Sequence, residues 1–298
     1  MAEKPAVRPD VAVGDGLRAV ARDVLSEARA VIEDQARGHA EAVHDFRKAM
    51  KRWRALLRLL EPFLGEDARR LRAQARDLAR ELSGARDAQS AIEALGDFVE
   101  DKTTPLSPRT IASLRGRLDA IRVGAETATL TQAMRAQLLV ALQAAEASVS
   151  AWPLDEISFS DLARELTETY RAMRDDAPRA DWRSVEPDVL HDLRSRVVAH
   201  RYQMELVEPL WPKFGKLWVA EAQRLRDRLG AFQDLSVLQG FTAPHQALAP
   251  WRSRLTPLIK ARQATHAKAA QRMAGRLLAE RPRAFRQRIA ALWKSSKR

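Results

Sequence analysis

The chain has 298 residues, of which 46% are hydrophobic, and it can therefore bury a large core as one domain or as two packed units. Lys and Arg outnumber Asp and Glu by 51 to 39, and the net charge of +12 favours polyanionic partners such as nucleic acid, anionic lipid or polyphosphate. The absence of Cys excludes disulfides, thiolate nucleophiles and Cys-ligated zinc. No signal-peptide core or apolar run of bilayer length is found, so we expect a cytoplasmic protein without membrane insertion.

Apolar residues recur at helical spacing along almost the whole chain, and the alternation typical of strands is hard to find. This pattern predicts an all-α protein. The helices are expected at about 16–37, 41–61, 67–83, 86–101, 108–123, 127–151, 158–175, 188–208, 214–229, 231–240, 245–280 and 283–296. Pro and short polar residues mark the breaks, which read DKTTPLSP, WPLDE, DDAPRADWRSVEPD and APHQALAP.

An internal repeat divides the chain into two halves. A shift of 147 residues places His44-Asp45 on His191-Asp192, and the same ungapped shift aligns Glu61-Pro62 with Glu208-Pro209. Between His44 and Asp87 it gives 12 identities in 44 columns. We therefore predict a flexible tail over residues 1–11 and a single domain over residues 12–298. Its two related helical halves cover residues 12–151 and 152–298.

The segment HDFRKAMKRWRALLR carries a row of basic residues on one helical face. Phe46, Met50 and Trp53 fall on the opposite, apolar face. The row consists of His44, Arg47, Lys48, Lys51, Arg54 and Arg58. A charged face is ordinarily a solvated surface with both signs interleaved, whereas this row has almost no acid among its cations. Such a row favours a bound polyanion.

The next helix repeats the arrangement, with Arg69, Arg72, Arg76 and Arg80 on one side. Guanidinium groups suit phosphate because their planar fork holds two oxygens at once. The second half keeps His191, Arg194 and Arg201 in the equivalent row. It has Ser195, Val198 and Glu205 where the first half has Lys48, Lys51 and Arg58. We therefore expect the N-terminal half to supply most of the binding free energy.

The two repeated histidines have two interpretations. A His beside Asp at the start of a helix is often only a local hydrogen-bonding residue. Alternatively, His44 and His191 face the ligand and strengthen binding when they are protonated. No HExxH motif or matched His spacing supports a metal site, so we expect no metal or other cofactor.

Several of these stretches together resemble the CHAD family, which is named for a histidine-bearing α-helical domain. They are HDFRKAMKRWRALLRLLEPF, RELSGARD, YRAMR, HDLRSRVVAHRY and RLGAFQDLSVL, and they occur in the family's order from about residue 12 to the end. The resemblance implies one compact domain of two pseudo-symmetric antiparallel helical bundles with long helices. It also implies a basic central surface that binds inorganic polyphosphate.

Matched to the family's motifs, His44, Arg47, Lys51 and Arg54 belong to the first basic helix. His191, Arg194 and Arg201 belong to the second, and Arg171 and Arg174 stand at the basic positions of YRAMR. The chain departs from the family pattern at Val198, where a basic residue is common, and at Gln89, where an acidic one is common.

We expect a binding protein without catalytic residues, because the chain has no phosphate-cradling Gly loop, nucleophile elbow or acid cluster for a divalent ion. The resemblance adds recruitment to polyphosphate granules. Two alternatives stay open, a nucleic-acid-binding helical protein and an accessory factor of polyphosphate metabolism. A homo-oligomer is compatible with the sequence but is not indicated by it. The apolar helix that ends at Trp293 fits either the chain's own core or a second subunit.

Overall fold

A computed structural model describes residues 5–82, 86–100, 105–126 and 130–296 of the chain. Within these residues the protein has eleven α-helices, three short 3-10 helices and no strand, which confirms the predicted all-α class. Four parts of the sequence predictions lie outside the described residues. They are the first four residues of the tail, the start of the break after Glu100, the start of the helix predicted at 127–151, and the SGA of RELSGARD.

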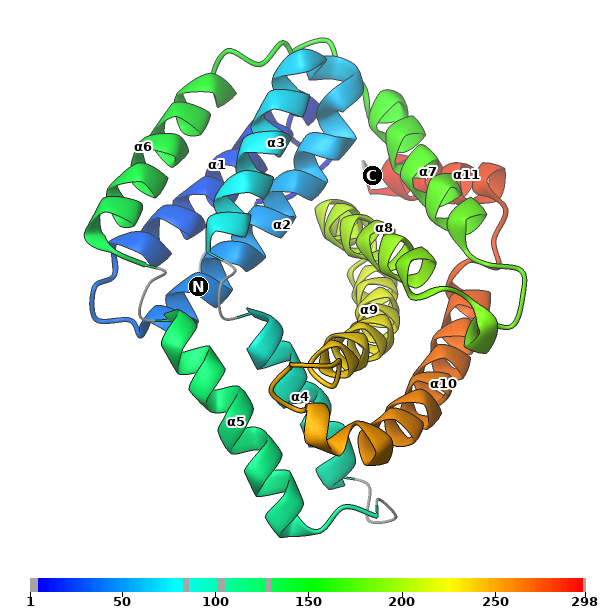
Figure 1. The fold of residues 1–298 in the computed structure, drawn as a ribbon. Coiled ribbons are helices and arrows are strands. Elements are labelled where there is room, and N and C mark those ends of the chain that lie inside the picture. Colours follow the sequence, from blue (N-terminus) through cyan, green and yellow to red (C-terminus); the bar gives the residue numbers. More distant parts are fainter. Residues whose placement is uncertain (1–4, 83–85, 101–104, 127–129, 297–298) are drawn as a thin grey trace.

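The helices fall into two series along the chain (Figure 1). The first series is α1 Val13–Glu33, α2 His39–Leu64, α3 Glu66–Glu81, α4 Arg86–Glu100, α5 Pro108–Glu126 and α6 Gln132–Val149. The second is α7 Phe159–Asp176, α8 Pro187–Val207, α9 Pro212–Gly240, α10 Arg252–Leu277 and α11 Pro282–Ser295.

The offset of 147 residues that relates the sequence repeats also relates these two series. It places α1 on α7, α2 on α8, α5 on α10 and α6 on α11, and it places α3 together with α4 on α9. The packing repeats as well, because α1 contacts α2 and α6 in the first half while α7 contacts α8 and α11 in the second.

The structure differs from the predicted elements at two places in the second half. Segments 214–229 and 231–240 form the single helix α9, because Gly230 is buried in it between Leu229 and Phe232. Tertiary packing there outweighs the helix cost of about 1 kcal/mol for one Gly. The helix predicted at 245–280 begins only at Arg252, since turns and the 3-10 helix Ala249–Trp251 occupy the preceding stretch, and His245 there has a φ of 66°.

The two halves meet where α2 crosses α8. Ala55 lies there against Ala199 and Tyr202, and Gln203 Nε2 donates to the Ala55 carbonyl oxygen at 3.1 Å. Small side chains at the crossing allow the two backbones to approach closely. Figure 1 shows α8 and α9 in the middle, with α2 and α3 on one side and α4 below them.

Both ends of the described chain are tied to the core. Val7, in the predicted tail, is fully buried, and its N–H donates to the Leu206 carbonyl oxygen at 2.9 Å. At the other end α11 packs on α7, where Trp293 stacks on Phe159 with ring centroids 4.0 Å apart. The apolar face of the last helix therefore serves the chain's own core.

Candidate functional site: a cationic cavity between the halves

A cavity of about 870 Å³ lies among α2, α4, α8 and α9, close to the α2–α8 crossing. The first half contributes α2 and α4, and the second contributes α8 and α9. The basic residues that line the cavity are Arg47, Lys48, Lys51, Arg86, Arg122, Arg194, Arg201 and Arg226, together with His39 and His44. The acidic residues are Glu41, Glu93, Asp97, Asp227 and Asp234. The lining is therefore rich in both signs, with cations in excess.

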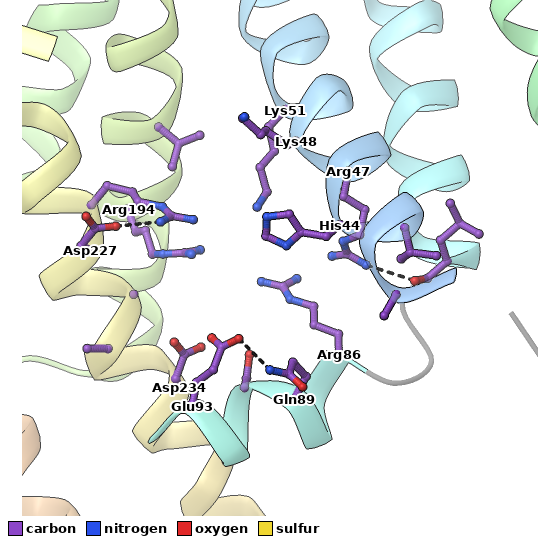
Figure 2. Close-up of a pocket in the computed structure, with 18 of the residues that line it drawn as sticks. His44, Arg47, Lys48, Lys51, Arg86, Gln89, Glu93, Arg194, Asp227 and Asp234 are labelled. Atoms are coloured by element: carbon purple, nitrogen blue, oxygen red, sulfur yellow. Dashed lines mark hydrogen bonds and ion pairs between the residues drawn. The ribbon is translucent and has the colours of Figure 1, made fainter. Parts of the chain in front are cut away.

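The wall formed by α2 carries the first part of the predicted basic row. Figure 2 shows His44, Arg47, Lys48 and Lys51 on this helix, opposite Arg194 of α8. Arg47 is held in place by the end of α3, because its Nη1 donates to the carbonyl oxygens of Ala79 and Leu82 at 3.1 and 3.5 Å. These contacts satisfy carbonyl oxygens in the last turn and at the C-cap of α3, where intrahelical donors run out, and they hold the guanidinium at the cavity wall.

Charge repulsion and burial act together on this wall. Burial, followed by the nearby Arg86, lowers the pKa of Arg47 to about 10. Lys51 is affected more strongly, since burial and four surrounding guanidinium groups lower its pKa to about 7. Burying unpaired positive charges costs free energy. Such groups are typical of sites where an anionic ligand supplies the counter-charge. Neither residue forms an ion pair with any described acid.

The wall formed by α8 and α9 contributes Arg194 and Arg201. Burial and the neighbouring Arg226 lower the pKa of Arg194 to about 10, and its Nε is buried without a hydrogen-bond partner among the described residues. Gly230 lies against this side chain, since a Cβ there would be in ordinary van der Waals contact with Arg194 Nε at 3.5 Å. Arg201 is paired with Glu205 and stacks over Tyr202 at 3.9 Å, so it is engaged within the protein.

The helices α4 and α9 place one cation and two acids at the edge of the cavity, with Arg86 and Glu93 on α4 and Asp234 on α9. Arg86 points into the cavity, whereas Glu93 and Asp234 lie side by side at the end away from Lys51 (Figure 2). Burial raises the pKa of Asp234, although a hydrogen bond from Ser90 and the charge of Arg194 act in the opposite direction. The cavity is therefore polar along its length, with a cationic wall and an acidic end.

Arg54 and Arg58 continue the α2 row beyond the cavity lining. Burial, Arg76 and Arg72 lower the pKa of Arg54, and burial, Arg72 and Arg196 lower that of Arg58. Within the described part of the chain neither forms an ion pair. These two residues extend the cation density of α2 past the α8 crossing.

The basic row of α3 is engaged by acids of the protein. Arg69 pairs with Glu61 and Glu66, Arg72 pairs with Glu61, and Asp77 pairs with both Arg76 and Arg80. None of these four arginines lines the cavity. The sequence predicts the same binding role for both rows. In the structure only the α3 row is paired with Glu61, because the α2–α3 hairpin brings this acid beside the start of α3.

The remaining predicted residues also lie outside the cavity lining. Arg171 pairs with Glu168, and Arg174 Nε donates to the Leu278 carbonyl oxygen at 3.0 Å. Tyr170 is buried, and its hydroxyl donates to the Glu280 carbonyl oxygen at 2.9 Å. The YRAMR segment therefore joins α7 to the end of α10. His191 is exposed on α8, whereas its repeat partner His44 lines the cavity.

Three cavity arginines were absent from the predicted set, namely Arg86, Arg226 and, on α5, Arg122. Arg86 stands in the RELSGARD stretch and could have been selected there, although its repeat partner is the uncharged Gln233. Arg226 falls on Ala79 in the repeat, so the alignment gives no signal for it. Its Nη1 pairs with Asp227 at 2.7 Å, and only the packing of α9 beside the cavity reveals its position.

The described residues hold no group of three or more His, Asp or Glu side chains arranged to bind a metal ion. Among the described helices, none combines the length and apolar character that crossing a bilayer requires. Fold and site together define an all-α protein of two repeated helical halves that enclose a cationic cavity.

The chain belongs to the CHAD family, since the CHAD domain model matches residues 17–243. Among solved structures it is similar to PptA from Streptomyces chartreusis. The two are 18% identical over 90% of this chain and 99% of that one, with a TM-score of 0.64. This likeness concerns the fold. No curated protein matches the chain.

Proposed function

We propose that this protein binds inorganic polyphosphate in the cavity between its halves and does not catalyse its turnover. The observation that carries the proposal is the facing arrangement of Arg47 and Lys51 with Arg194. These cations converge from two repeated helices, and within the described residues none has an ion-pair partner. Membership of CHAD, a family linked to polyphosphate, supports this choice among polyanions.

The chemistry of the lining suits a flexible phosphate chain. Arginine offers a planar fork to phosphate oxygens, and lysine adds a mobile point charge. A bound polyanion would replace the missing counter-charge of the α2 wall and would release its own counterions, so affinity should fall steeply with salt. Arg54 and Arg58 offer further charge to a chain that extends beyond the cavity.

Non-catalytic binding is favoured by the arrangement of the acids, because among the described residues no three His, Asp or Glu side chains are grouped to hold a metal ion. A phosphoryl-transfer site would need carboxylates grouped to hold a divalent ion against the phosphates. Here Asp227 is paired with Arg226, and Asp97 contacts His266 Nε2 through its Oδ2 at 2.5 Å. Incubation with polyphosphate and magnesium should therefore release no phosphate above a buffer blank. Turnover that depends on Arg47 would contradict this part of the proposal.

Nucleic acid is the competing ligand, and its recognition in single strands relies on aromatic side chains that stack on bases. The aromatic residues near the halves' junction are used internally. Trp53 stacks on Trp152 with centroids 5.7 Å apart, and Trp218 Nε1 donates to His200 Nε2 at 2.8 Å. Tyr202 lines the cavity but is buried beneath Arg201.

A competition experiment tests the proposal. Labelled long-chain polyphosphate is bound at physiological salt, and unlabelled polyphosphate, single-stranded RNA or duplex DNA is added in equal phosphate concentration. We expect unlabelled polyphosphate to displace the label at far lower concentration than either nucleic acid. Equal displacement by RNA would replace the proposal with nucleic-acid binding. Recruitment of a cytoplasmic protein to polyphosphate granules is the expected cellular consequence, and fluorescence co-localisation of the tagged protein would measure it.

A further inference from the structure

Lys51 occupies an unusual place in the cavity. It is the last α2 residue that lines the cavity, and guanidinium groups on four helices act on its charge. They belong to Arg47 on α2, Arg86 on α4, Arg194 on α8 and Arg226 on α9. Burial and like charge both disfavour an ammonium ion, and an amine can relieve the cost by losing its proton, which an arginine does not do at ordinary pH.

All four charges that shift the pKa of Lys51 belong to guanidinium groups, and no acid of the cavity is among them. Asp227 pairs with Arg226, Asp97 contacts His266, Asp234 accepts from Ser90, and Glu93 accepts from Gln89 Nε2 at 3.0 Å. The other charged or titratable groups facing the cavity are His44, Lys48 and His39 on α2, Glu41 beside them, Arg201 and Tyr202 on α8, and Arg122.

We propose that polyphosphate binding is coupled to protonation of Lys51, so that the cavity takes up about one proton from solution as the ligand enters. The inference rests on the proposed function and names a regulation of the same site. In the empty cavity the neutral amine is favoured above neutral pH. Phosphate oxygens reverse the balance, because they surround the group with negative charge, and the product is an ammonium ion paired with the ligand.

The pH window follows from the direction of the shift. Burial, then Arg226 and Arg194, lower the pKa of Lys51 from 10.5 to about 7 in the empty protein. Below that value the group is charged in both states and adds no pH dependence. Between this value and the restored pKa of the bound state, affinity falls as pH rises, at up to about tenfold per pH unit. Alkaline conditions therefore favour release.

The experiment is calorimetric titration of the protein with long-chain polyphosphate at pH 8.5, in two buffers of different ionisation enthalpy. The difference in observed heat gives the number of protons taken up. Wild type should take up close to one. Lys51→Arg, which keeps the charge permanently, should bind with almost none. Lys48→Arg, the same chemical change on an exposed lysine one turn earlier, should keep the uptake.

One further variant tests the role of the charge. Lys51→Met keeps the volume without the charge. Its affinity should be lower than that of wild type at pH 6.5 and should converge with it as the pH is raised towards 10. Circular dichroism checks that each variant is folded.

The outcomes distinguish this inference from the proposed function. Tight binding with equal proton uptake in wild type and Lys51→Arg would overturn the coupling and leave polyphosphate binding intact. Tight binding with no uptake in wild type would do the same. Failure of wild type to bind polyphosphate at any pH between 6.5 and 9 would overturn the proposed function itself.

Discussion

The two basic rows of the first half look alike in the sequence and differ in the folded protein. The α3 row is matched by Glu61, Glu66 and Asp77, and it lies outside the cavity. The α2 row meets other cations from α4, α8 and α9, and at Arg47 and Lys51 it lacks ion pairs with the described acids. We therefore expect a row of cations to bind a polyanion only where the acids of the folded protein do not pair with it.

The largest expected effect comes from removing cations that face each other across the cavity. Arg47→Gln combined with Arg194→Gln should weaken polyphosphate binding by about 100-fold, since each charged contact contributes roughly 1.5 kcal/mol or more. The matched control is Arg69→Gln combined with Arg76→Gln, which removes the same charge from α3 and should weaken binding less than about threefold. Fluorescence anisotropy at fixed salt measures both. Equal losses of affinity in the two double variants would contradict the proposed difference between the α2 and α3 rows.

The second prediction concerns the stability of the empty protein. Lys51→Met should raise the free energy of unfolding by about 1–3 kcal/mol at pH 7, because it removes a charge that is buried among cations. The lowered pKa means that the unfolded chain binds more protons between pH 7 and 10.5, so wild-type stability rises with pH over that window. The advantage of Lys51→Met should therefore shrink towards pH 10 in denaturant titrations. An advantage that grows with pH would contradict the assigned environment of Lys51.

The third prediction uses the position of Gly230 against the Arg194 side chain. Gly230→Leu should push the guanidinium aside and lower polyphosphate affinity by about three- to tenfold, which corresponds to part of one charged contact. Gly230→Ala is the control, because its Cβ would make only an ordinary contact. It should bind within about twofold of wild type and should stabilise the helix by about 0.5–1 kcal/mol. Binding unchanged in the Leu variant would show that Arg194 does not need this position.

The smallest effect should come from freeing the α3 row. Glu61→Gln combined with Asp77→Asn removes acids that pair with Arg69, Arg72, Arg76 and Arg80. Exposed ion pairs contribute little to stability, so the fold should persist. The added positive potential should raise polyphosphate affinity about two- to threefold at low salt, and the gain should vanish at high salt. A loss of affinity would indicate that these acids position groups needed for binding.

Much of this arrangement could be predicted from local pattern. The apolar spacing around Phe46 and Trp53 fixes which face of α2 is basic, because helix periodicity depends only on the chain itself. The repeated His-Asp and Glu-Pro pairs predicted a second helix equivalent to α2. The 147-residue offset then holds for nearly every helix of the two halves.

The contacts between different helices could not be predicted from local sequence pattern. The pairing of Glu61 with Arg72 depends on how tightly the α2–α3 hairpin closes around Gly65, whose φ is 57°. The approach of Arg226 to Lys51 depends on the packing of α9 against α4 and α8. No spacing within a single helix contains that information. The family motif YRAMR likewise gives no hint that Arg174 is used by the Leu278 carbonyl.

The most direct test of the central claim is a crystal structure of the protein with bound polyphosphate. We predict continuous phosphate density inside the cavity, within hydrogen-bond distance of Arg47 and Arg194 and beside Lys51. Phosphates that follow Arg69, Arg72 and Arg76 along the outside of α3, with an empty cavity, would contradict the account.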